Sequence, residues 1–227
     1  MGVRLVVVVE GATEQEFVNG VLAPHLGAFG VDARASVVGK VGALRRGGGH
    51  RGGGPFARWE RDIRQILGDG QDGGLRVSTL FDLYGLPKDF PGLVELQCEA
   101  DGGRRCDGAE AALARVFSDR RLIPYVQKHE FESLVLASLP QLRSLLDAGD
   151  DLAGLEALEA EIRGIAAEDV DDGPESAPSK RLLRHVPGYR KTLHGPMVVG
   201  ATGLPALRER CPRFDGWVRR LEGLVEG

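Results

Sequence analysis

Three carboxylate residues each follow a run of strand-forming residues: Glu10, Asp82 and Glu130. In an open parallel sheet the carboxyl ends of the strands lie along one edge, and ligands bind in the crevice there. Carboxylates gathered at that edge repel one another and raise one another's pKa. Mg²⁺ or Mn²⁺ relieves the repulsion by taking oxygen ligands, and it can polarise a phosphoryl oxygen and activate water. The sequence therefore predicts a metal site suited to phosphoryl chemistry.

Glu10 is the strongest of these candidates. It directly follows Val6–Val9 and precedes the expected start of a helix, so helix capping does not account for it. Glu14 and Glu16 lie in the first turn of that helix, where the helix dipole favours acids. Thr13 with Glu16 three residues later predicts a capping box. Helix capping accounts for the presence of Glu16. For Glu14 both capping and metal binding are possible roles.

The remaining acids have ordinary alternatives. Asp82 by itself fits a turn residue. Glu130 and Glu132 are two residues apart, and on a helix they would point to nearly opposite sides, so at most one is expected to face a site comfortably. His129 is more often a structural, hydrogen-bonded histidine than a ligand. The metal hypothesis therefore depends on the predicted sheet.

An alternation of strands and helices must position these acids. Four runs predict strands: Val3–Val9, Ala33–Val38, Leu75–Phe81 and Leu122–Val126. Between and after them, helices are predicted beyond Gly11, at 55–67 with Pro55 in the first turn, at 109–117 and beyond Glu132. This order predicts an α/β layer with a mainly parallel sheet.

Only helical patterns remain after about Leu139. We therefore expect a core over residues 1–138 and a helical extension over residues 139–227, packed together as one compact unit. Trp217, Leu221 and Val225 keep helical spacing, which favours a buried helix face over a base-stacking platform.

Composition excludes several classes of protein. The 227 residues suffice for a full core, and 42% are hydrophobic and 27% charged, as in ordinary globular proteins. No apolar run approaches the roughly 20 residues of a membrane helix, and the N-terminus has a strand pattern rather than a signal peptide. The three cysteines, Cys98, Cys106 and Cys211, lack a C-x-x-C spacing, which favours a reduced, cytoplasmic compartment and argues against structural zinc.

The net charge of -4 conceals two basic segments separated by an acidic one. Residues 34–64 hold eight Arg and Lys against two acids, residues 180–220 hold ten against two, and residues 147–175 hold eleven acids against one arginine. Basic segments bind phosphates or form solvated helix faces. The candidate phosphate-binding residues are Arg45, Arg46, Arg51, Lys180, Arg181 and Lys191. The glycine-rich loop around the first three lacks the Lys-Ser/Thr ending of a P-loop, so ATP binding there is not expected.

Several motifs, taken in order, resemble a known family. Val9-Glu10-Gly11-x-Thr13-Glu14 resembles the first motif of TOPRIM domains, especially those of the overcoming-lysogenization-defect nucleases, and Phe81–Pro87 lies where the second, acidic motif is expected. Ile123–Leu134, with His129-Glu130-Phe131-Glu132 inside it, resembles the central signature of the domain of unknown function 4276 family. Three C-terminal stretches are similar to that family too: Ala177–Arg181, Pro187–Lys191 and Cys211–Trp217.

The resemblance implies a TOPRIM-like Rossmannoid fold, in a cytoplasmic bacterial protein often paired with an ATPase in mobile-element or phage-defence loci. TOPRIM enzymes use a glutamate and an aspartate pair with Mg²⁺ to cut or join nucleic-acid backbones. By match, Glu10 is the motif glutamate, as general acid/base or metal ligand, and Asp82 is the first aspartate. Tyr84 stands where a second aspartate is expected. The metal site is then one ligand short or completed by Glu14, Glu130 or Glu132.

The leading hypothesis is a Mg²⁺-dependent nuclease or related phosphodiester-transfer enzyme with Glu10, Asp82, Glu130 and Lys180 as catalytic residues. Basic residues of the C-terminal segment would bring positive charge to the phosphate or grip the strand, or else solvate a helical cap. The alternative is a catalytically degenerate TOPRIM-like module that docks on a partner ATPase, which Tyr84 favours. A metal-dependent phosphatase for a small phosphoester is a third hypothesis.

Overall fold

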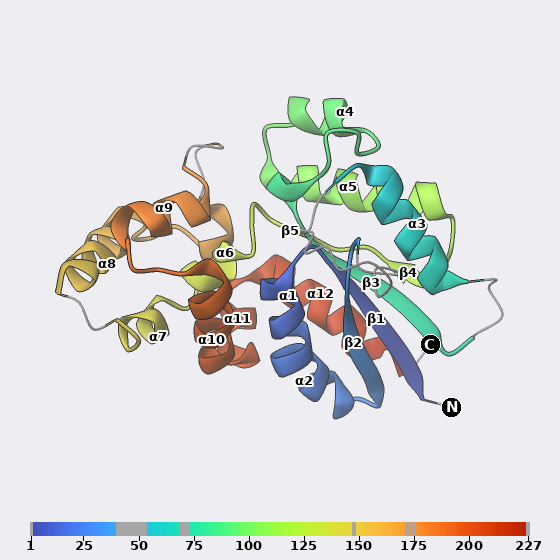
Figure 1. Ribbon diagram of the computed structural model, residues 1–227, viewed down its shortest axis with the longest axis horizontal. Coiled ribbons are helices and arrows are strands. Elements are labelled where there is room, and N and C mark those ends of the chain that lie inside the picture. Colours follow the sequence, from blue (N-terminus) through green and yellow to red (C-terminus); the bar gives the residue numbers. More distant parts are fainter. Residues whose placement is uncertain are drawn as a thin grey trace.

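The computed structural model describes residues 2–39, 54–68, 73–146, 149–170, 173 and 176–225. Within them the chain forms a parallel sheet in the order β2-β1-β3-β4, with β5 paired to β3 beyond β4 (Figure 1). The strands are β1 (Val3–Val9), β2 (Val31–Val37), β3 (Leu75–Asp82), β4 (Leu122–Ile123) and β5 (Val126–Gln127). The predicted α/β class with a mainly parallel sheet is confirmed.

The central strand β1 is buried on both faces of the sheet. Val7 and Val9 belong to one hydrophobic cluster and Val6 and Val8 to the other, and all four side chains are at most 3% exposed. Alternate residues of a strand point to opposite faces, so a continuous run of valines fits a strand covered on both sides. This double cover explains why the run could be read correctly from sequence.

Helices cover the two faces of the sheet in separate sets (Figure 1). On one face lie α3 (Phe56–Leu67) and α5 (Gly102–Phe117), whose Trp59, Ile63 and Leu113 pack with Val6 and Val8. On the other face lie α1 (Ala12–Phe17), α2 (Ala23–Gly27) and α12 (Pro212–Glu222). A π-helical turn at Val18–Leu22 joins α1 to α2, and the short helix α4 (Leu93–Cys98) precedes α5.

The remaining helices follow the sheet in sequence. They are α6 (Glu132–Leu136), α7 (Leu139–Arg143), α8 (Gly149–Glu161), α9 (Pro178–His185), α10 (Lys191–Thr202) and α11 (Leu204–Arg210). None of the helices in the described residues is long and apolar enough to cross a membrane. The division at residue 139 into a core and an extension stays a prediction.

The C-terminal helix α12 closes the hydrophobic core against the sheet. The Trp217 ring stacks on Tyr125 with centroids 4.5 Å apart, and its indole N–H donates to Ser78 Oγ at 2.9 Å. The carboxylate of Glu168 accepts from the backbone N–H groups of Arg213 and Phe214 and so caps the first turn of α12. Trp217 is 1% exposed, which confirms the predicted buried helix face at that residue.

The strand predicted over Leu122–Val126 is interrupted in the structure. Pro124 lacks a backbone N–H and cannot take part in the ladder, so the pairing divides into β4 and β5. Between them Thr79 Oγ1 donates to the Tyr125 carbonyl at 2.7 Å and accepts from the Tyr125 N–H at 2.9 Å. The threonine hydroxyl thus replaces the missing ladder contacts at this point of β3.

The predicted capping box of Thr13 and Glu16 was wrong. The N-cap of α1 is Gly11, and the Glu14 carboxylate, three residues on, accepts from the Gly11 N–H at 2.9 Å. Thr13 and Glu14 are buried, whereas Glu16 is exposed. The helix begins two residues earlier than expected, and this turns Glu14 toward the carboxyl end of β1.

Candidate functional site

Glu10 lies immediately after β1, at the carboxyl edge of the sheet. Its Oε1 accepts from the backbone N–H of Asp82 at 2.7 Å. A Cβ atom on Gly85 would lie 2.4 Å from Glu10 Oε2, so the chain after β3 closes over this carboxylate. The pKa of Glu10 is raised to about 8, chiefly by burial and also by the carboxylates of Glu14 and Glu130, against the lowering effects of the Asp82 N–H and of Lys191.

Asp82 is the last residue of β3 and lies beside Glu10. Its Oδ1 accepts from the Phe131 N–H at 2.8 Å, which ties the strand end to the start of α6. Burial raises the pKa of Asp82 well above its usual value, and the charges of Glu10, Glu14 and Glu132 add to that rise. Asp82 therefore faces the other acids of the site instead of serving only as a turn residue.

Glu132 is the most deeply buried acid of the site, with 0% exposure. Lys191 Nζ lies 2.8 Å from its Oε2. The ion pair is poorly aligned for a hydrogen bond, and neither oxygen of Glu132 accepts an aligned hydrogen bond from the described residues. Burial raises the pKa of Glu132 to about 7, and Lys191 opposes that rise. Lys191 thus compensates the charge of Glu132 at Oε2, while Oε1 accepts no hydrogen bond within the described residues.

Glu130 takes a different direction from Glu132. Its Oε2 accepts from the Ser179 N–H at the start of α9, at 2.9 Å. His129, just before it, has a φ of 63°, a left-handed conformation uncommon for a residue with a side chain, and its carbonyl accepts from the Tyr84 N–H at 3.1 Å. The diverging partners fit the expectation from sequence spacing, yet the Glu130 charge still raises the pKa of Glu10.

Lys191 is the cation at the centre of these acids. It begins α10, and its side chain is 41% exposed. Burial lowers its pKa, but the charges of Glu132 and Asp82 outweigh that effect, so the pKa of Lys191 lies above its usual value. The ammonium group therefore stays charged and compensates part of the negative charge of the site.

Tyr189 belongs to the same site and was missed by sequence reasoning. It is 2% exposed, and its hydroxyl makes no hydrogen bond of good geometry with the described residues. Burial raises the pKa of Tyr189 well above its usual value, and the adjacent Glu132 carboxylate adds to the rise. Its position two residues before Lys191, inside the stretch Pro187–Lys191, was the available signal.

The donor set fits a hard divalent cation in its chemistry. Five carboxylates share this edge, and backbone N–H groups hold one oxygen each of Glu10, Glu14, Asp82 and Glu130. Among the described residues the buried oxygens of Glu132 make no aligned hydrogen bond, and Lys191 pairs with Oε2 alone, so a metal ion would find an open ligand in Oε1. Over the described ranges, no three His, Cys, Asp or Glu side chains are grouped closely enough to hold an ion as they stand. Binding would therefore require the carboxylates to turn toward it.

The predicted basic residues are distributed differently. Lys180 is exposed on α9, next to Ser179. Arg181 is 7% exposed, pairs with Glu161 and donates from Nε to the Ser176 carbonyl at 2.8 Å. Arg45, Arg46 and Arg51 lie outside the described residues. Of the predicted phosphate-binding residues that are described, only Lys191 has its charge directed among the acids of the sheet edge.

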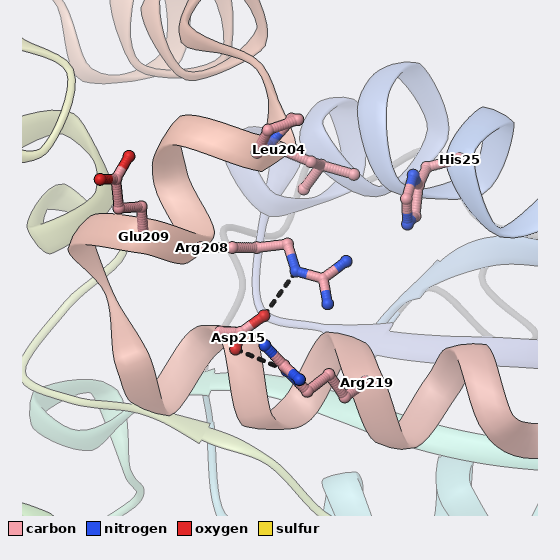
Figure 2. Close-up of a pocket in the computed structure, with 7 residues that line it drawn as sticks. His25, Leu204, Arg208, Glu209, Asp215 and Arg219 are labelled. Atoms are coloured by element: carbon pink, nitrogen blue, oxygen red, sulfur yellow. Dashed lines mark hydrogen bonds and ion pairs between the residues drawn. The ribbon is translucent and has the colours of Figure 1, made fainter.

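A separate pocket of about 420 Å³ lies between α2, α11 and α12 (Figure 2). Its charged side chains pair among themselves: Asp215 accepts from Arg208 Nε at 2.5 Å and from Arg219 Nε at 2.7 Å. His25 at its rim lies 2.6 Å from Glu222. Because these charges are compensated and none of the strand-end acids lines it, the pocket does not extend the site of Glu10 and Asp82.

The chain is similar to one protein family and to several solved structures. A family model described as a domain of unknown function (DUF4276) matches residues 9–222. Among solved structures, the C-terminal region of the Burkholderia pseudomallei OLD protein is similar, with 14% identity, a TM-score of 0.47, and 100% of this chain and 98% of that chain covered. The C-terminal region of the Xanthomonas campestris pv. campestris OLD protein has 15% identity, a TM-score of 0.49, and 98% and 92% coverage. The comparison with curated proteins found no match.

Proposed function

This chain belongs to the DUF4276 family, and we propose that it is a Mg²⁺- or Mn²⁺-dependent nuclease or related phosphodiester-transfer enzyme. The observation that carries the proposal is the meeting of carboxylates from β1, α1, β3 and α6 around Lys191 at one edge of a parallel sheet. Buried acids with raised pKa values gather at functional sites, and this set has more negative charge than one lysine compensates.

In this proposal Glu10, Asp82 and Glu132 hold the metal ion, with Glu14 and Glu130 beside them. A bound Mg²⁺ would supply Lewis acidity toward a phosphoryl oxygen and a more acidic bound water. Lys191, already directed into the cluster, would hold positive charge near the phosphate, a role earlier given to Lys180. In the metal-free site Glu10, whose pKa is raised to about 8, holds a proton near neutral pH that metal binding would displace.

Tyr84 supplies no carboxylate where the TOPRIM pattern expects one. Its ring instead lies against His129, with centroids 5.5 Å apart. The charge of Glu132 contributes to the raised pKa of Asp82. We propose that Glu132 completes the acid set in place of the missing aspartate.

The biological setting is proposed from resemblance alone. The motifs resemble those of overcoming-lysogenization-defect nucleases, so the proposed substrate is DNA or RNA. The proposed context is mobile-element or phage defence in the cytoplasm, together with a partner ATPase.

The test is cleavage of plasmid DNA and of RNA by purified protein with Mg²⁺ or Mn²⁺. Glu10→Gln is expected to lower the rate by about 10²-fold or more, because it removes a metal ligand and proton acceptor. It should not destabilise the protein, since it replaces a buried carboxyl of raised pKa with a neutral group of the same shape. Glu16→Gln, an exposed acid on the same helix, is the matched control. Full activity of Glu10→Gln would sink the catalytic assignment.

A second candidate function is a degenerate module that docks on a partner ATPase. Two observations favour it: Tyr84 in the second motif, and the absence of a ready-made group of three metal ligands among the described residues. Calorimetric titration with Mn²⁺ distinguishes the two. Binding that Glu132→Gln weakens supports the enzyme, and no heat of binding with the wild type supports the module.

A further inference from the structure

Arg105, on α5, has a guanidinium group that pairs with no acid among the described residues. Its Nε–H is buried and donates to no acceptor in the part of the chain that the structure describes. No described carboxylate forms an ion pair with it, whereas the preceding Arg104 lies 3.9 Å from Glu99 and Arg213 pairs with Asp107 and Glu110. A buried donor on a charged group is costly to leave unsatisfied, so the arrangement favours an anion supplied from outside the chain.

The ring of Tyr84 holds this guanidinium in place. The Arg105 Cζ atom lies 5.6 Å from the Tyr84 ring centroid, within the range of a cation–π contact. The same ring also lies near that of His129, with centroids 5.5 Å apart. Arg105 and His129 therefore both contact the Tyr84 ring, the His129 ring at a tilt of 42°.

Tyr84 and His129 each adjoin a residue of the carboxylate site in the chain. Gly85, which follows Tyr84, closes over the Glu10 carboxylate, and Glu130 follows His129. The first turn of α5 also lies against Lys128 and His129. A Cβ atom on Gly102 would be 2.9 Å from Lys128 Cε and 3.1 Å from His129 Cε1. Arg105 therefore contacts, through Tyr84, the segment whose next residue closes over the Glu10 carboxylate.

We infer that Arg105, held by Tyr84, binds a backbone phosphate of a nucleic-acid strand, next to the phosphate that lies at the carboxylate site. The inference rests on the proposed function for the class of substrate. A guanidinium presents a planar fork of donors that matches two phosphate oxygens, and its Nε–H would thereby gain an acceptor. Tyr84 then has a role of its own at the motif position where an acid is expected.

The experiment measures binding without cleavage. Fluorescein-labelled strands of about 20 nucleotides, as duplex DNA, single-stranded DNA and RNA, are titrated with full-length protein in EDTA from about 50 to 300 mM KCl. Arg105→Gln is expected to weaken binding of the preferred strand by about 3- to 10-fold and to lower the slope of log K against log salt by nearly 1. Arg104→Gln removes the same charge one residue away and is expected to change binding less than about 2-fold.

The tyrosine gives a second, independent readout. Tyr84→Phe keeps the ring and should bind as the wild type does, whereas Tyr84→Leu removes the ring and should weaken binding about as much as Arg105→Gln does. Thermal unfolding of each variant shows whether it is folded. If Tyr84→Leu fails to fold, the comparison of folded Tyr84→Phe and Arg105→Gln still tests the inference. Equal effects of Arg104→Gln and Arg105→Gln would overturn the inference, and so would wild-type protein that binds none of the strands.

The outcome is separable from that of the proposed function. Binding that depends on Arg105 in a protein that never cleaves with Mg²⁺ or Mn²⁺ would support the phosphate contact and reject the nuclease. Cleavage that depends on Glu10 but is accompanied by binding insensitive to Arg105 would support the nuclease and reject the phosphate contact.

Discussion

The carboxylates at the edge of the sheet ionise at a higher pH than ordinary surface acids do. Burial raises the pKa of Glu10 to about 8 and that of Glu132 to about 7. Near neutral pH the metal-free site therefore keeps protons that an unfolded chain would release. A metal ion must displace those protons, so metal binding and proton release are linked at these residues.

We expect the metal-free protein to lose stability as the pH rises from about 5 to about 8. In that window the folded state holds a proton on Glu10 that the unfolded state, with a pKa near 4.5, has already released. The native state thus binds more protons, and the free energy of unfolding falls with pH until the folded pKa is passed. Thermal unfolding in EDTA across this range measures the effect.

Glu10→Gln is the control for this pH dependence. The variant cannot titrate at position 10, so its stability should fall less steeply over the same range, with Glu132, Asp82 and the other acids of raised pKa giving the remainder. A melting temperature that is flat or rises with pH in the wild type would contradict the raised pKa values.

At the scale of elements, the turns after β1 and β3 bring the acids together. Gly11 ends the extended chain and begins α1, and the 3-10 turn Leu83–Gly85 follows β3 directly. Gly11 lies close to the Glu14 carboxylate and Gly85 lies close to the Glu10 carboxylate, because neither glycine carries a side chain. The strands determine where the acids emerge, and these turns determine how closely they meet.

Gly85→Ala is expected to displace the Glu10 carboxylate, since the new methyl group would lie 2.4 Å from Oε2. Its backbone is not in the left-handed region, so the effect is one of space alone. Overpacking of this kind costs about 1 to 3 kcal/mol of stability. The cleavage rate should also fall under conditions where the variant is fully folded, because the Glu10 carboxylate is displaced. Urea unfolding and plasmid nicking measure the two effects.

Gly216→Ala on α12 is the matched control, because a Cβ atom there meets nothing within 4 Å. An alanine in a helix is favoured over glycine by about 0.5 to 1 kcal/mol, so this variant should be slightly more stable and fully active. Normal cleavage by Gly85→Ala would show that Glu10 need not be held where it lies.

At the scale of the whole molecule, the C-terminal helices complete the core of the sheet. Residues of β1, α1, α10 and α12 belong to one hydrophobic cluster, and the Glu168 carboxylate fixes the start of α12. Lys191 and Tyr189 reach the acids from this same C-terminal part. A complete site therefore requires both halves of the chain to fold together.

Trp217→Ala is expected to cost about 3 to 5 kcal/mol, because it removes a buried ring stacked on Tyr125 and the hydrogen bond to Ser78. Unfolding in urea, followed by fluorescence of the remaining tryptophan and by circular dichroism, should show one transition at a lower midpoint. Two separate transitions, with the sheet unaffected, would indicate that the helices after residue 139 form an independent unit.

The sequence by itself determined the central strands and the acids at their ends. Val3–Val9 was predicted with the bounds that the structure has, and the strand before Asp82 differs by one residue, because continuous apolar β-formers are typical of a strand covered on both faces. From parallel strands alone it follows that Glu10 and Asp82 share an edge, and the structure has them in contact through the Asp82 N–H.

The tertiary structure alone decided which side chains complete the site. Lys191 meets Glu132 across 59 positions of sequence, Arg105 meets Tyr84 across an intervening helix, and Glu14 turns inward because Gly11 begins α1 earlier than the pattern predicts. Hydrophobic periodicity reports which face of an element is buried, and it carries no information on which distant polar groups meet there. Those partners depend on how helices from the C-terminal part pack against the edge of the sheet.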